Sequence, residues 1–282
     1  MKIGISGASG KLGQAVVSEL NVRSAGQQVV GISRSPQNLK AVAEAREGDY
    51  DRPETLARAY AGLDRLLLIP SADLQPGARG TQLKAAIDAA VQAGVEHIFL
   101  VSASGTREVP ETALNAGFWV AEQHLIKTAK RWTILRMNYY AESMAEEIQT
   151  SLPQGMLAGL GDERVAYVSR DDLAAAAAGA LLSDGHSGAI YNITGPAIVT
   201  GPERAAIVSE VFAKPIGFVV ITKEQLRGGL SQAGLPAQVV EVVTEIKTTF
   251  VQGNFDIVSG DAERLAGRAP KSLRDVLVAS RS

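Results

Sequence analysis

The chain has 282 residues, a formal net charge of −2 at pH 7 and no cysteine. Without cysteine there are no disulfide bonds, thiol nucleophiles or thiolate metal sites. The small net charge gives no reason to expect nucleic acid or an anionic membrane surface as a partner. Its three histidines, His97, His124 and His186, lack any metal-ligand spacing, and His97 is expected to have a structural role just before a strand.

No apolar run approaches the roughly 20 residues that a membrane-spanning helix needs. The first strand is expected to begin at residue 2, which leaves no room for a signal peptide. We therefore expect a cytoplasmic protein without a metal, whose chemistry comes from an organic cofactor or from ordinary polar side chains.

Three glycines follow the first predicted strand, Lys2–Ser6, and precede a predicted helix over Gln14–Leu20. In such a turn Gly7 permits a sharp bend, Gly10 leaves room for a pyrophosphate beside backbone N–H groups, and Gly13 lets helix and strand pack closely. The alternative is a glycine-rich turn without a ligand. Because the glycines lie between the first strand and the first helix, the pattern predicts dinucleotide binding.

The second predicted strand, Val29–Ser33, ends at Ser33-Arg34-Ser35. An NAD site usually places a carboxylate here to bind the ribose 2′-hydroxyl, and none is present. Arg34 can instead donate a charge-assisted pair of hydrogen bonds to a 2′-phosphate, and Lys11 adds charge nearby. The alternative is a solvated arginine, but the pattern favours NADP, with NAD possible.

Strand and helix signals then alternate, with uninterrupted apolar strands typical of a parallel sheet covered on both faces. The sequence therefore predicts an α/β, Rossmann-type doubly wound parallel sheet, with its ligand at the carboxyl edge. Helices are expected at 56–61, 81–93 and 119–129, strands at 65–69, 98–102 and 133–137, and loops at the carboxyl edge over 7–13, 34–36, 49–50, 70–80, 102–108 and 138–142.

After Glu146 the pattern loosens. We expect a Rossmann domain over 1–150, with segments near 165–195 returning to it, and a smaller, mainly substrate-binding α/β lobe over 151–282. The elements expected here are strands at 165–168, 189–193 and 218–221 and helices at 171–180, 202–212, 223–233, 239–250 and 273–279.

Several further motifs resemble the NmrA-like group of atypical short-chain dehydrogenases/reductases. They are Gly48-Asp49-Tyr50, Leu135-Arg136 with Tyr139-Tyr140, Ser169-Arg170-Asp171-Asp172 and Tyr191-Asn192-Ile193-Thr194-Gly195. Within this group the chain resembles most the branch of NADPH-dependent quinone oxidoreductases and triphenylmethane reductases.

The resemblance implies roles around the cofactor for residues in six segments. Gly7, Ser9, Gly10, Lys11, Leu12 and Gly13 would hold the pyrophosphate, Arg34 the 2′-phosphate, and Asp49 and Tyr50 would flank the adenine. Ile69, Pro70 and Ser71 would line the path of the ribose and nicotinamide, and Ser102, Ala103 and Ser104 with Tyr139 and Tyr140 would surround the nicotinamide ring.

The chain departs from typical short-chain dehydrogenases, which protonate a carbonyl oxygen with a Tyr-x-x-x-Lys pair. The corresponding helix is expected to begin near Leu114 and has no such pair. Glu122 matches an acidic position of the family and is expected to anchor the helix in an ion pair. Tyr139, Tyr140 and Ser104 remain as candidate catalytic residues, and each tyrosine is equally consistent with packing.

Two classes of function are consistent with the missing pair. One is a reductase that passes hydride from NADPH to an electron-poor conjugated acceptor such as a quinone, since the resulting anion takes its proton from water. The other is a non-enzymatic NAD(P)-binding redox sensor of the NmrA type; a reductase or isomerase of a specialised substrate is a third reading. The expected partner is a small apolar or aromatic acceptor, and a homodimer is possible.

Overall fold

The computed structural model describes residues 1–23, 26–111, 113 and 115–281. The chain forms two compact units. Leu114, where one helix was expected to begin, lies outside the described residues. The first unit comprises residues 1–137, 170–193 and 261–268, and the second comprises residues 138–169, 194–260 and 269–282. The chain therefore first leaves the first unit after Met137. From the sequence, the first domain was expected to extend to residue 150.

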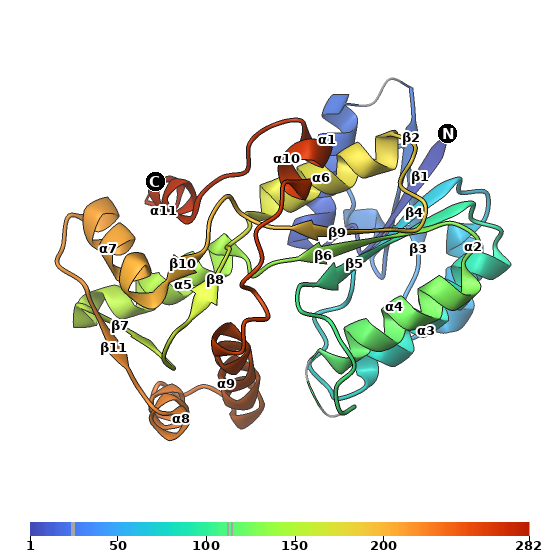
Figure 1. The fold of residues 1–282 in the computed structure, drawn as a ribbon. Coiled ribbons are helices and arrows are strands. Elements are labelled where there is room, and N and C mark those ends of the chain that lie inside the picture. The colour runs from blue at the N-terminus through green and yellow to red at the C-terminus, as the bar shows by residue number, and fades with distance from the viewer. Residues whose placement is uncertain (24–25, 112, 114, 282) are drawn as a thin grey trace. The chain divides into compact units, whose positions relative to one another are not determined.

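The first unit contains a seven-stranded sheet in which all paired strands are parallel. This confirms the predicted doubly wound arrangement. From β1 the chain builds outward in one direction to β2 and β3, and then in the other through β4, β5, β6 and β9 (Figure 1). Across the sheet the strands are β3 (Glu44–Glu47), β2 (Gln28–Ser33), β1 (Lys2–Ser6), β4 (Arg65–Leu68), β5 (His97–Ala103), β6 (Trp132–Met137) and β9 (Ala189–Ile193).

The central strands are buried along most of their length because helices cover both faces of the sheet. Every residue of His97–Ala103, for example, is buried. Two groups of helices pack among themselves, α1 with α6 and α10, and α3 with α2 and α4, and they lie on opposite faces of the sheet (Figure 1). The helices are α1 (Lys11–Arg23), α6 (Arg170–Leu182), α10 (Asp261–Ala266), α2 (Leu56–Tyr60), α3 (Ala78–Gln92) and α4 (Ala116–Thr128), with short 3₁₀ turns η1 (Pro36–Asn38) and η2 (Pro53–Thr55).

Two elements of this unit were not expected from the sequence. The edge strand β3 reads Glu-Ala-Arg-Glu, because an exposed edge needs no apolar face and charged residues there discourage pairing with other chains. The short helix α10 packs against α6. At that contact a Cβ on Gly179 would come within 1.9 Å of the Leu265 carbonyl oxygen, so the close approach requires glycine.

In its described residues, the second unit combines two small sheets with five helices, and it has its own apolar core. Strand β7 (Met156–Gly159) pairs in parallel with β11 (Gly217–Val220), and β8 (Arg164–Val165) pairs antiparallel with β10 (Val199–Thr200). The expected strand over 165–168 is therefore wrong beyond Val165. The helices are α5 (Ala141–Ser151), α7 (Gly201–Phe212), α8 (Lys223–Gln232), α9 (Ala237–Val251) and α11 (Leu273–Ala279), with a 3₁₀ turn η3 (Leu152–Gln154).

Helix α5 corrects the expectation of a loop over 138–142 followed by loosely patterned chain. Its buried residues, Ala141, Met144, Ala145 and Ile148, recur at helical spacing and form one face of the core. Among the described residues, no helix is both long enough and apolar enough to cross a membrane.

Candidate dinucleotide-binding site

The predicted cofactor-binding residues of the first unit all lie at the carboxyl ends of β1 to β5, either in the loops there, in the first turn of α1 or in the last residues of β5. The order of the strands reverses between β1 and β4, which are neighbours in the sheet. In open parallel sheets the crevice at such a reversal is where ligands bind. The loops after β1 and β4 begin here, and the Ile69 N–H donates to the Ser6 carbonyl oxygen at 3.1 Å.

The glycine turn after β1 has one glycine that faces open space and two that the fold itself requires. A Cβ on Gly13 would come within 2.3 Å of the Gly7 carbonyl oxygen, and Gly7 has a φ of +91°. A Cβ on Gly10 would meet only the Gly7 carbonyl oxygen, at 3.4 Å. Ser9, Gly10 and Lys11 are exposed, at the start of α1. The turn therefore offers an open backbone at a helix N-terminus, which suits a pyrophosphate.

Arg34 lies directly after β2 and is exposed to solvent. Two hydrogen bonds of the preceding residue, Ser33, hold this turn in place. The Ser35 N–H donates to the Ser33 hydroxyl at 3.0 Å, and the Gly48 N–H donates to the Ser33 carbonyl oxygen at 3.1 Å. In the part of the chain that the structure describes, the Arg34 guanidinium makes no hydrogen bond or ion pair. All five of its N–H donors are available to an anionic ligand.

Asp49 and Tyr50, the predicted adenine neighbours, are already engaged within the protein. The Asp49 carboxylate accepts from the Asp51 N–H at 3.1 Å and from Arg52 Nε at 3.2 Å. The Tyr50 hydroxyl donates to the Ile69 carbonyl oxygen at 3.0 Å, and burial raises its pKa to about 12. The Tyr50 hydroxyl thus ties the loop after β3 to the loop after β4.

A buried glutamine makes a second connection between the same two loops. Gln82 of α3 donates from Nε2 to Asp51 Oδ1 at 2.7 Å, and its Oε1 accepts from the Ser71 hydroxyl. Its side chain is almost entirely buried. Sequence reasoning missed Gln82 because a single polar residue within a helix gives no motif; only the fold shows that it reaches two loops.

The end of β5 carries two serines in different environments. The Ser102 hydroxyl donates to Glu122 Oε1 at 2.6 Å, so its proton is used within the protein. The Ser104 side chain is 2% exposed, and its hydroxyl is the kind of buried group that normally has a partner. No described residue provides one. The Ser104 hydroxyl is thus buried and unsatisfied within the described residues.

These observations test whether the site suits a phosphorylated dinucleotide. Gly10 leaves open space over a helix N-terminus, Arg34 offers a cation without a partner, and Ser104 has an unsatisfied hydroxyl. They lie at the ends of β1, β2 and β5, as an extended ligand along the carboxyl edge requires. The residues therefore fit the cofactor. Tyr50, Ser71 and Ser102 make hydrogen bonds within the protein that hold the segments at this edge of the sheet in place.

Tyr139 and Tyr140 belong to the second unit, although they follow β6 directly in the chain. The Tyr139 hydroxyl donates to Glu147 Oε1 at 2.7 Å, and the pKa of Tyr139 is raised, chiefly by burial. Tyr140 precedes the first turn of α5 and forms a β-bridge with Val168.

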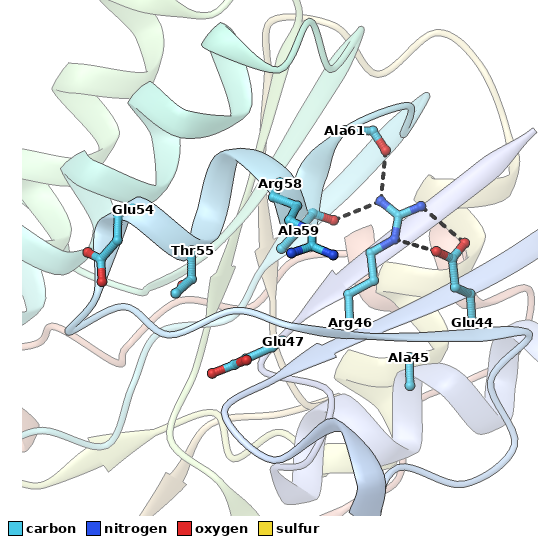
Figure 2. A pocket seen from close by; sticks show the side chains of 9 residues that line it. All are labelled: Glu44, Ala45, Arg46, Glu47, Glu54, Thr55, Arg58, Ala59 and Ala61. Carbon is cyan, nitrogen blue, oxygen red and sulfur yellow. Dashed lines mark hydrogen bonds and ion pairs between the residues drawn. The ribbon is translucent and has the colours of Figure 1, made fainter.

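A cavity of about 630 Å³ lies at the β3 edge of the sheet, and Figure 2 shows its lining. Arg46 is fully engaged there: Nε donates to Glu44 at 2.8 Å, and Nη1 donates to the carbonyl oxygens of Ala59 and Ala61 at 2.8 and 2.7 Å. A second cavity, of about 400 Å³ and mainly apolar, lies in the second unit beside α7 and α11. Neither contains a predicted cofactor-binding residue.

The histidines have structural environments. His97 is buried and shares a 2.8 Å hydrogen bond with the Thr133 hydroxyl. The His124 Nε2 lies 2.6 Å from Asp88 Oδ1. The described residues contain no group of three or more histidine, aspartate or glutamate side chains that could hold a metal ion.

Residues 7–184, more than half of the chain, match a family model described as NAD(P)H-binding. The chain belongs to this NAD(P)H-binding family. Quinone oxidoreductase 2 of Escherichia coli is 28% identical over 97% of this chain and 96% of its own length. The NAD(P)H azoreductase of Xenophilus azovorans is 30% identical over 74% of this chain and 72% of its own.

Solved structures agree with this membership. The E. coli quinone oxidoreductase 2 structure with NADPH has a TM-score of 0.92 at 28% identity, covering 99% of this chain and 100% of that one. The Citrobacter sp. triphenylmethane reductase structure with NADP(H) has a TM-score of 0.89 at 27% identity, covering 98% and 99%. These similarities confirm the resemblance to the quinone oxidoreductase and triphenylmethane reductase branch.

Proposed function

We propose that this protein is an NADPH-dependent reductase that transfers hydride to electron-poor conjugated acceptors, with quinones as the first class to test. The observation that carries the proposal is the open glycine turn at the N-terminus of α1, in a chain that matches a quinone oxidoreductase over nearly its whole length. The azoreductase and the triphenylmethane reductase among its relatives are named for dye-like conjugated substrates.

In this proposal the first unit holds the cofactor. The turn from Gly7 to Gly13 binds the pyrophosphate through backbone N–H groups, and Arg34 binds the 2′-phosphate. Asp49 and Tyr50 flank the adenine, Ile69 to Ser71 line the ribose path, and Ser102 to Ser104 lie against the nicotinamide. When bound, the reduced cofactor supplies the hydride. The second unit supplies the acceptor-binding surface.

The missing Tyr-x-x-x-Lys pair supports the choice of acceptor. Helix α4 contains no tyrosine, and its Glu122 is bound by Arg136 and Ser102. A conjugated acceptor spreads the incoming charge over its π system, so its anion can take a proton from water without a strong positioned acid. An isolated ketone, whose alkoxide needs a donor, fits this chain less well.

The same missing pair favours one alternative, a non-enzymatic NAD(P)-binding sensor. A spectrophotometric screen separates the two by following NADPH oxidation with quinones, azo and triphenylmethane dyes, enones and aldehydes, with NADH in parallel. The reductase proposal expects turnover with quinones or dyes and preference for NADPH. Tight binding of both reduced and oxidised cofactor without turnover of any acceptor would instead establish the sensor.

A further inference from the structure

Three polar side chains from separate elements form a hydrogen-bonded chain within the second unit. The Tyr139 hydroxyl donates to Glu147 Oε1 at 2.7 Å, and Glu147 Oε2 pairs with Lys247 Nζ at 2.5 Å. Tyr139 follows β6, Glu147 lies on α5, and Lys247 lies on α9. The Lys247 side chain is only 8% exposed, so its buried charge is balanced by a carboxylate that is itself partly exposed.

Aromatic rings surround Tyr139 and fix its orientation. Its ring meets those of Phe250, Phe255 and Tyr167 edge to face, with centroids 4.9, 6.1 and 6.3 Å away. Phe250 and Tyr167 are fully buried, whereas Tyr139 and Phe255 are partly exposed. Lys247 Nζ also lies 4.9 Å from the centre of the Phe250 ring. Tyr139 is therefore one of two rings in this cluster that are not fully enclosed, and it is the one that a hydrogen bond holds in place.

The hydrogen bond to Glu147 commits the only proton of the phenol. A hydroxyl that donates to a carboxylate keeps two lone pairs but has no second hydrogen for a ligand. Burial, the charge of Glu147 and the more distant charge of Glu146 all raise the pKa of Tyr139, with Tyr167 acting in the same direction. The phenol is thus a poor acid, held neutral and in one orientation.

We propose that Glu147 and Lys247 are positioning residues for Tyr139, which presents a fixed, uncharged aromatic surface to a flat conjugated acceptor and does not supply its proton. This inference rests on the proposed function for the identity of the acceptor. Stacking against a preoriented ring gives affinity for flat π systems at little entropic cost. Lys247 acts by balancing Glu147, which would otherwise be a partly buried and unpaired carboxylate.

The positioning step can be tested without turnover, by ¹³C NMR of protein labelled at the tyrosine ring carbon that bears the hydroxyl. Tyr139→Phe assigns the signal among the six tyrosines. In the wild type the Tyr139 signal should stay in its neutral form throughout the stable pH range. Glu147→Gln should change the chemical shift of this signal, because the hydroxyl then faces a neutral amide in place of the carboxylate to which it donates. Glu210→Gln, in an exposed pair with Arg274, should leave the signal unchanged.

The acceptor step is tested by kinetics with 1,4-naphthoquinone and by the response of the same NMR signal to added quinone. Tyr139→Leu should raise the quinone KM about tenfold or more and leave the Kd for NADPH unchanged, whereas Tyr139→Phe should keep kcat within about threefold. Lys247→Met and Glu147→Gln should raise KM more than they lower kcat. Circular dichroism melting checks that each variant is folded.

The results that would overturn the inference are separate from failure of the reductase proposal. A Tyr139→Phe variant with kcat reduced about a hundredfold and KM intact would make the phenol a proton donor. An unchanged Tyr139 chemical shift in Glu147→Gln would remove the positioning role. If no acceptor is reduced by the wild type, the reductase proposal fails, while a naphthoquinone-induced shift of the Tyr139 signal still supports the aromatic surface and its absence overturns it.

Discussion

Arg136 binds both carboxylate oxygens of Glu122, with Nε at 2.9 Å from Oε1 and Nη2 at 2.6 Å from Oε2. The pair joins β6 to α4, and the Ser102 hydroxyl of β5 adds a third hydrogen bond to the same carboxylate. The Glu122 side chain is only 1% exposed. The ion-pair role expected for Glu122 is therefore confirmed, and the carboxylate fixes the end of β5 close to the predicted nicotinamide site.

Replacing Glu122 by Gln should lower the free energy of unfolding by about 2–4 kcal/mol, because Arg136 and Ser102 lose a charged acceptor in a buried setting. The change should be measured by urea unfolding. The double variant Glu122→Leu/Arg136→Met is the control, and it should recover part of the loss because no buried charge is left unpaired. Unchanged stability together with abolished turnover would instead assign Glu122 a direct chemical role.

Gly10 and Gly13 should respond differently to a side chain. Gly10→Val should abolish dinucleotide binding in titration calorimetry and leave the melting temperature nearly unchanged, because its Cβ meets only the Gly7 carbonyl oxygen. Gly13→Ala should destabilise the fold itself, since its Cβ would lie 2.3 Å from that oxygen. Normal NADPH affinity in Gly10→Val would remove the turn from the site.

Arg34→Ala should weaken NADPH binding by about 1.5–3 kcal/mol, the range of a hydrogen bond to a charged group, and should leave NADH binding little changed. Arg58→Ala is the matched control, because Arg58 is an exposed arginine at the cavity beside β3. Equal loss of both cofactors would indicate that Arg34 is structural. No loss of either would mean that another cation binds the phosphate.

The sequence predicted most of the first unit because its signals are local. An apolar run such as Phe99–Val101 indicates a strand that is buried on both faces. The spacing of the glycines after β1 indicates a tight turn between a strand and a helix. Strand β3 was missed because an edge strand lacks that apolar run. Helix α5 was missed although Ala141, Met144, Ala145 and Ile148 carry its period, since the preceding tyrosines had been assigned to a loop.

The connections within the site could not be predicted in the same way. Gln82 joins Ser71 to Asp51, and Lys247 reaches Glu147 from a helix about 100 residues further along the chain. Such contacts depend on how elements pack in three dimensions, and no spacing in the sequence encodes them. The structure alone shows that the Tyr50 hydroxyl makes a hydrogen bond within the protein and that the Ser104 hydroxyl makes none with a described residue.

His97 should make the protein less stable as the pH falls. Burial and the nearby Arg131 and Arg65 lower its pKa to about 4, so the folded state keeps the imidazole neutral while the unfolded state binds a proton near pH 6.5. Stability is therefore lost between about pH 6.5 and pH 4, up to about 3 kcal/mol. Denaturant unfolding of His97→Gln over this range should show a weaker pH dependence than the wild type. Equal slopes in the wild type and in His97→Gln would show that other groups cause the loss of stability in acid.

Ser104→Ala should affect the stability of the free protein and its affinity for the cofactor in opposite directions. Because its buried hydroxyl has no partner among the described residues, Ser104→Ala removes an unsatisfied polar group and should leave the free protein equally stable or slightly more stable. If the hydroxyl binds the cofactor or the acceptor, the same variant should lose about 0.5–1.5 kcal/mol of affinity or of barrier lowering, the net value of one neutral hydrogen bond. Thermal melting with and without NADPH measures both effects, since the cofactor should stabilise the variant less than the wild type.

Ser102→Ala is the control: it removes a satisfied hydroxyl and should cost stability in the free protein. If Ser104→Ala were as destabilising as Ser102→Ala, and cofactor binding were unaffected, Ser104 would be part of the scaffold and not of the site.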